Sequence, residues 1–214
     1  MDCRKAKIKI GWIILSVLLI SGCFGLLLKG KVTENRYYSP MNNFSIALPG
    51  LMEMKIEDQS DYAGGGVTFR GSNGMFWLVN YRKLTDDVAS KYGSPDKRDE
   101  AYRIYVTDVP LRNAQRFSPN SSIVKDEFID MHGSRRYFAV LNIPEGSRLV
   151  HPVTNRRFDS VRGMLVFEKN GFIYMLGWEM NYVGHPTYAS RLTDKQIGEA
   201  KETLGRIEDS MIFM

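Results

Sequence analysis

The chain has 214 residues, a formal net charge of +5 and two cysteines. Residues 1–30 contain five cations and one anion, which leaves a net charge of +1 for the remainder. This balance excludes the concentrated basic surface that is typical of nucleic-acid-binding domains. The cysteines, Cys3 and Cys23, both lie in residues 1–30. Disulfide bonds and thiol nucleophiles are therefore excluded from the rest of the chain.

A charge-free apolar run opens the chain at residues 10–28, with four cations before it and Lys29 and Lys31 after it. About 20 apolar residues are enough to cross the bilayer core as a helix. The sequence therefore predicts an N-terminal hydrophobic helix that holds the chain in a membrane. Because N-terminal cations stay on the cytoplasmic side, we expect the following domain on the extracytoplasmic side, in the cell envelope or periplasm.

Two forms of this tether fit the sequence. In one form the run is an uncleaved signal anchor, a transmembrane helix. In the other it is a lipoprotein signal, because Ile20-Ser21-Gly22-Cys23 resembles a lipobox and would leave a lipid on Cys23. The run continues through residues 24–28, whereas mature lipoproteins usually turn polar after the cysteine. Both forms stay open, and the division of the chain is the same: targeting segment 1–30, polar linker 31–36 and one domain over 37–214.

The first half of the domain shows strand patterns. Alternating or apolar segments at 44–48, 52–56, 67–69 and 75–81 predict four strands of an antiparallel meander. Asn73-Gly74 supplies the positive φ that a tight hairpin turn requires. Gly64-Gly65-Gly66 lacks the helix and lysine that follow a phosphate-binding loop, so it indicates a bulge or the end of a hairpin.

The middle of the chain predicts a helix and then two hairpins. Residues 96–117 carry apolar side chains at helical spacing, and Pro110 predicts a break near Asp108. Strands at 123–129 and 135–143 flank a turn at His132-Gly133, and strands at 161–168 and 172–180 flank Lys169-Asn170-Gly171. Residues 144–160, which contain two prolines, predict a loop.

The last element is predicted as an amphipathic helix. Thr193 and Gln196 match the capping box Thr-x-x-Gln, and an apolar stripe follows at a spacing of three or four residues. Its members are Ile197, Ala200, Leu204, Ile207 and Met211. Helices segregated from antiparallel strands indicate an α+β layered domain.

Both ends of the domain resemble PsbP-like domains, named for the extrinsic subunit of photosystem II. Tyr38-Ser39-Pro40, Phe44-Ser45-Ile46 and Leu48-Pro49 are similar to the opening strand of that family, and Asp209-Ser210-Met211-Ile212-Phe213 is similar to its closing phrase. The resemblance implies an α/β/α sandwich with a central antiparallel sheet, in a bacterial membrane-anchored or lipoprotein member. It also implies a binding or assembly module without a common catalytic residue.

Few residues indicate chemistry. His132, His151 and His185 lie in separate predicted loops without a paired metal-binding spacing. We therefore expect no metal, cofactor or catalytic site. Arg156, Arg157 and Arg162 form a cluster that could contact an anionic surface such as lipid headgroups, or lie solvated in the loop.

We expect a non-enzymatic, membrane-tethered envelope protein that binds a protein partner or supports an assembly. Two alternatives stay open. One is an extracytoplasmic hydrolase or ligand-processing enzyme, which would need His151, Asp159 and a serine to converge in a cleft. The other is a passive structural lipoprotein.

Overall fold

The computed structural model describes residues 28–48, 54–71, 76–94, 97–147, 150, 153–180 and 193–214. Residues 10–27 of the predicted N-terminal helix, with Cys23, lie outside these residues. So do the Asn73-Gly74 turn, His151 and His185.

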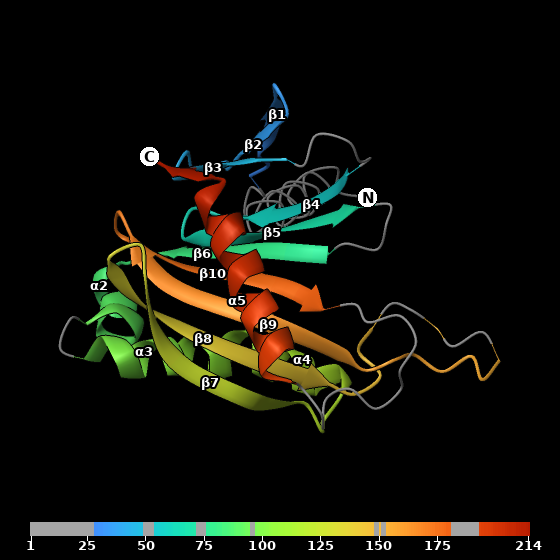
Figure 1. The fold of residues 1–214 in the computed structure, drawn as a ribbon. Helices are drawn as coiled ribbons and strands as arrows, with labels where there is room; N and C mark the ends of the chain where they lie inside the picture. Colours follow the sequence, from blue (N-terminus) through green and yellow to red (C-terminus); the bar gives the residue numbers. More distant parts are fainter. Residues whose placement is uncertain are drawn as a thin grey trace, which may run out of the picture.

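Within the described residues, the strands form two antiparallel sheets (Figure 1). The larger sheet has seven strands in the order β4-β5-β6-β10-β9-β8-β7, and the smaller has four in the order β1-β2-β3-β11. The strands of the larger sheet are β4 (Met54–Ser60), β5 (Gly64–Gly71), β6 (Phe76–Lys83), β7 (Ser122–Met131), β8 (Ser134–Ile143), β9 (Ser160–Lys169) and β10 (Phe172–Met180). Those of the smaller sheet are β1 (Lys31–Thr33), β2 (Arg36–Tyr38), β3 (Phe44–Ala47) and β11 (Met211–Phe213).

Both faces of the larger sheet are covered, which confirms the α+β fold class and gives an α/β/α arrangement. Helix α5 (Asp194–Asp209) crosses one face, and α3 (Arg98–Val106) packs on the other (Figure 1). Alternation along β8 explains this, because Phe138 and Val140 pack under α5 while Tyr137, Ala139 and Leu141 pack on α3. A strand buried on both faces is apolar at consecutive positions.

The last helix forms as predicted. Thr193 and Gln196 make both hydrogen bonds of the capping box. Ile197, Ala200 and Leu204 of the predicted stripe are buried against the sheet. Met211 lies beyond the helix, in β11.

Helical structure on the other face continues past the proline. Short helix α2 (Asp86–Val88) and the π-helical turn η1 (Ala89–Gly93) precede α3, which leads through η3 (Thr107–Leu111) into α4 (Arg112–Phe117). Pro110 lies inside η3, so the break predicted near Asp108 is a widened π-helical turn rather than an end. A wider turn accommodates a residue that has no N–H to donate.

Two expectations about the N-terminal part of the domain are wrong. Residues 31–36, expected to be a linker, hold β1 and the start of β2, joined by Glu34 and Asn35 at φ 51° and 59°. Two consecutive residues with positive φ close a tight hairpin. Strand β3, expected in the meander, instead pairs with β2 and β11 in the smaller sheet.

The two ends of the larger sheet are built differently. One end, here called the turn end, carries the turns β4–β5, β7–β8 and β9–β10. The predicted turns His132-Gly133 and Asn170-Gly171 are confirmed there, with φ between 50° and 75°. The other end, here called the loop end, carries the connection 144–159 between β8 and β9 and the start of β7.

Candidate functional site

The turn end holds a hollow of about 510 Å³. Its floor is formed by the ends of β5 and β6, and its wall by α2 and η1. Arg82 and Lys91 supply cations to it, and Asp61 and Asp87 supply anions. Lys91 forms an ion pair with Asp108 at 2.7 Å. The Asp108 carboxylate also accepts a hydrogen bond from the Tyr92 hydroxyl at 2.9 Å. The hollow is therefore polar and of mixed charge.

The glycine run explains the floor of this hollow. A Cβ at Gly65 would collide with Ser60, one at Gly66 with Asn80, and one at Gly64 with the carbonyl of Tyr81. The run begins β5 directly after the β4–β5 turn and pairs with β6 in regular register. It is thus the end of a hairpin, one of the two structures expected from the sequence, and close packing accounts for its glycines.

A partly buried chain of hydrogen bonds includes two residues of the lining, Ser60 and Tyr81. The Tyr37 hydroxyl and the Ser60 hydroxyl both donate to the Asp58 carboxylate, at 2.5 and 2.7 Å, and Ser60 shares a 2.7 Å hydrogen bond with Tyr81. Burial raises the pKa of Tyr81 to about 12, and burial together with Asp58 raises the pKa of Tyr37 further. A tyrosine acting as a general base needs the opposite shift, so this chain of groups holds its protons and stabilises the fold.

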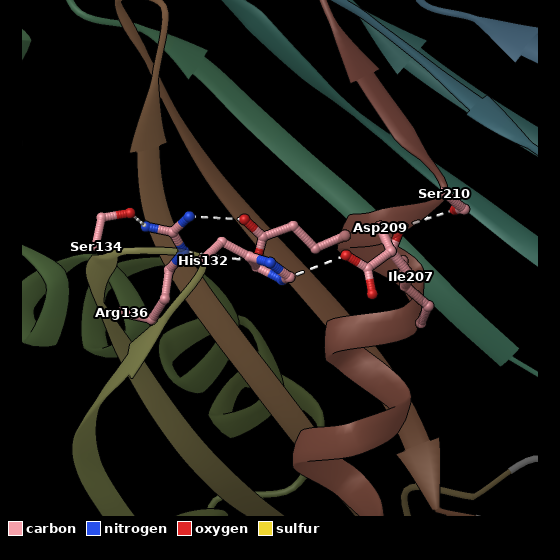
Figure 2. A network of polar contacts seen from close by, with 7 residues as sticks. His132, Ser134, Arg136, Ile207, Asp209 and Ser210 are labelled. Atoms are coloured by element: carbon pink, nitrogen blue, oxygen red, sulfur yellow. Dashed lines mark hydrogen bonds and ion pairs between the residues drawn. The ribbon is translucent and has the colours of Figure 1, made fainter.

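A second network joins the β7–β8 hairpin to the end of α5 (Figure 2). The Arg136 guanidinium pairs with the Glu208 carboxylate at 2.7 Å, and both side chains are buried. Arg136 also lies over the Phe167 ring, at 4.7 Å from its centroid, and donates to Ser134. At the hairpin turn, His132 lies 3.4 Å from Asp209 and 3.9 Å from Glu208. No local sequence pattern reveals the Arg136–Glu208 ion pair, because the two residues are 72 positions apart.

The loop end holds a hollow of about 540 Å³, between the end of α4 and the start of the β8–β9 connection. Phe117, the last residue of α4, stands on its wall with 90% of its surface exposed. Arg157 and Arg162 line the same hollow, together with Glu145. A hollow that is lined by an exposed aromatic ring and by cations is the kind of surface that binds a partner with an apolar and an anionic group.

The structure separates the three predicted arginines. Arg162 is half-buried in the lining of the hollow: it pairs with the buried Glu179 at 3.2 Å and lies over Phe76. Arg156 is exposed and lies 3.8 Å from Glu145. Arg157 is exposed on the wall of the hollow. The surface available to an anion is therefore carried by Arg157 and Arg156.

Asp159, the carboxylate named for the enzyme alternative, accepts a hydrogen bond from the Glu145 backbone N–H at 2.9 Å. Across the described ranges, no His, Cys, Asp and Glu side chains gather in threes around a possible metal position. In the same part of the chain, no helix combines the length and apolar character needed to cross a membrane.

The described residues define an α/β/α domain with a hollow at each end of its larger sheet. No family model matches the chain, and no curated protein matches it in sequence. The structure is similar to the solution structure of cyanobacterial PsbP (CyanoP) from Synechocystis sp. PCC 6803, at 13% sequence identity and a TM-score of 0.48. That match covers 88% of this chain and 99% of that one. That protein belongs to the family that the sequence resembles, and the likeness concerns the fold alone.

A crystal structure of a protein from Bacteroides thetaiotaomicron VPI-5482 also matches, at 9% identity and a TM-score of 0.41. It covers 86% of this chain, which spans 49% of that one.

Proposed function

We propose that this chain is a membrane-tethered, non-catalytic binding or assembly module of the cell envelope, with its folded domain on the extracytoplasmic side. The observation that carries the proposal is the charge-free apolar run of residues 10–28, preceded by four cations. Such a run partitions into the bilayer, and the cations fix its N-terminal side to the cytoplasm.

The loop end supports the binding part of the proposal. Burying an exposed phenylalanine against a partner gains free energy, and Phe117 lines the same hollow as the exposed Arg157. We infer that the partner presents an apolar group next to an anionic group. Arg156 extends this cationic surface, whereas the charge of Arg162 is paired with the buried Glu179.

Membrane attachment and sidedness are tested together. The full chain should stay in the membrane fraction after an alkaline carbonate wash, and protease added to the outside of spheroplasts should digest its domain. A chain that is released by the wash, or that is protected from the protease, would overturn the proposal. Intact-mass analysis then separates the two forms of tether: a lipidated N-terminus at Cys23 identifies a lipoprotein, and the full-length mass identifies a signal anchor.

Partner binding is tested by photo-crosslinking in the native envelope. A photoreactive phenylalanine analogue at position 117 should give a protein adduct, and Arg157→Glu should abolish it by reversing the charge beside the ring. The same analogue at Ile212, which is exposed in β11 of the smaller sheet, is the control. If positions 117 and 212 give the same adducts, the loop end is not the binding surface.

A further inference from the structure

The chain enters the folded domain without a free linker. The Leu28 backbone N–H donates to the Ser60 carbonyl at 3.0 Å, and the Gly30 N–H donates to the Asp58 carboxylate at 2.6 Å. Strand β1 then begins at Lys31. Leu28 is also the last residue of the apolar run. The domain is therefore fixed to its tether at the residue where the apolar sequence ends.

The direction of the chain at this point is also defined. Leu28 and Ser60 form an antiparallel bridge along β4. In an antiparallel pair, going back along one strand means going forward along the other. From Leu28 to Gly30 the chain therefore runs away from the residues after Ser60, which are those of the β4–β5 turn. This turn belongs to the turn end of the sheet.

The β4–β5 turn presents an aromatic side chain there. Tyr62 has 69% of its surface exposed, although the residues on either side of it are joined by hydrogen bonds. The Asp61 carboxylate accepts hydrogen bonds from the backbone N–H groups of Ala63 and Gly64, at 2.7 and 3.0 Å. The turn thus holds Tyr62 outward on a well-ordered support. Lys29 and Lys31 are exposed on the adjoining segment.

We propose that this surface, made of Tyr62, Lys29 and Lys31, lies in the headgroup layer of the bilayer that holds the tether. The inference rests on the proposed function, because it needs the apolar run to be in a membrane. Tyrosine is enriched at membrane interfaces, where its ring is apolar and its hydroxyl remains hydrated. Lysine side chains extend to lipid phosphates from such positions.

Either form of tether keeps this surface near the bilayer. A signal anchor ends at Leu28 itself. A lipid on Cys23 leaves residues 24–28, which can reach at most about 17 Å when fully extended. In neither case can the turn end move far from the membrane.

The loop end then faces away from the same bilayer. Strand β9 (Ser160–Lys169) runs from the loop end to the turn end over 10 residues, or about 30 Å. Arg157 and Phe117 lie at the far end of that distance. The orientation therefore leaves the loop end free for a partner and removes its arginines from contact with the lipid that anchors the chain.

The test uses the full chain in vesicles of phosphatidylethanolamine and phosphatidylglycerol. A photoreactive phenylalanine analogue is placed at Tyr62 or, as a matched control, at Phe117, which is also an exposed aromatic residue. We expect the yield of lipid adduct to be several-fold higher at 62 than at 117. Equal yields at the two positions, or a higher yield at 117, would overturn the inference.

A second variant tests whether the short connection is the cause. A long Gly/Ser segment inserted just before Leu28 should leave the chain in the membrane but lower the lipid adduct at 62 several-fold. An unchanged adduct would show that the connection does not set the orientation. The carbonate wash separates the two failures. Release from the membrane refutes the tether itself, whereas retention without a lipid adduct at 62 refutes only the orientation.

Discussion

The turn end and the loop end of the larger sheet differ in how many of their side chains are held in hydrogen-bonded networks and how many point to solvent. At the turn end, two-residue turns close the β7–β8 and β9–β10 hairpins, and Arg136, Glu208, Asp58 and Tyr81 are held in hydrogen-bonded networks. At the loop end, a connection of 16 residues, 144–159, joins β8 to β9, and Phe117 and Arg157 point to solvent.

This difference in side-chain burial indicates which end contributes to stability and which end is available for binding. Buried networks with every partner in place rigidify a fold, and removing one member leaves an unsatisfied group in a low-dielectric interior. Exposed side chains on loops contribute little to folding and are free to meet a partner. We therefore expect the turn end to carry conformational stability and the loop end to carry recognition.

The largest effect is expected for Glu208→Ala. It leaves the Arg136 guanidinium buried without its counter-charge, and breaking a buried pair costs about 3–5 kcal/mol of the free energy of unfolding. Urea unfolding of the full chain in a mild detergent measures the loss. Glu202→Ala is the control, because Glu202 pairs with Arg206 on the exposed side of the same helix and should cost less than about 0.5 kcal/mol. Equal losses for the two variants would show that the pair is not a structural anchor.

The second largest effect is expected at alkaline pH, where the free energy of unfolding should fall because Tyr81 loses its proton. The unfolded chain loses the Tyr81 proton near its ordinary pKa of 10.0, while the folded chain keeps it until about pH 12. The folded state thus binds more protons in this window, so stability falls as the pH rises from 10 to 12, by about 2 kcal/mol.

Urea midpoints measured across this window test the effect. Tyr81→Phe should make this part of the pH dependence less steep, whereas Tyr62→Phe at the exposed turn should leave the slope unchanged. Some slope remains in Tyr81→Phe, because burial also raises the pKa of Tyr37 and Tyr174. The same slope in Tyr81→Phe as in the parent chain would contradict the assignment.

The loop end offers a weaker version of the buried ion pair. Arg162 pairs with Glu179 and lies over Phe76, as Arg136 pairs with Glu208 and lies over Phe167. The Arg162 side chain is 24% exposed, against 4% for Arg136. Because water reaches the Arg162 guanidinium when its partner is removed, Glu179→Ala should cost about 2 kcal/mol, clearly less than Glu208→Ala. Urea unfolding of both variants measures the two losses in the free energy of unfolding. A larger loss at the loop-end pair would show that burial does not set the cost.

The sequence predicted most of what local chemistry determines. His132-Gly133 and Asn170-Gly171 specify turns, Thr193 and Gln196 specify a helix start, and the strand patterns of the two later hairpins specify their pairing. These features depend on residues within a few positions of one another. The turn at Glu34 and Asn35 was missed because only Asn35 favours a positive φ.

The candidate surfaces depended on contacts that no local pattern reveals. Arg156, Arg157 and Arg162 are neighbours in sequence, yet alternation and register send Arg162 inward to Glu179. For Phe117 the sequence predicts only a place in a helix. Its exposure could not be predicted, because it depends on where α4 ends relative to the sheet. The contact of Leu28 with Ser60 spans 32 positions and required the strand pairing of β4 to be known.

The smallest effect on stability is expected at the binding surface itself. Phe117→Ala and Arg157→Ala remove exposed side chains, and such surface substitutions usually change the free energy of unfolding by less than about 0.5 kcal/mol. Each should nevertheless reduce the recovery of the crosslinked partner from the envelope. For this measurement the photoreactive residue is placed at Asn120, on the rim of the same hollow. A variant that loses stability together with the adduct would place the loop end in the scaffold, and one that keeps both would remove it from the binding surface.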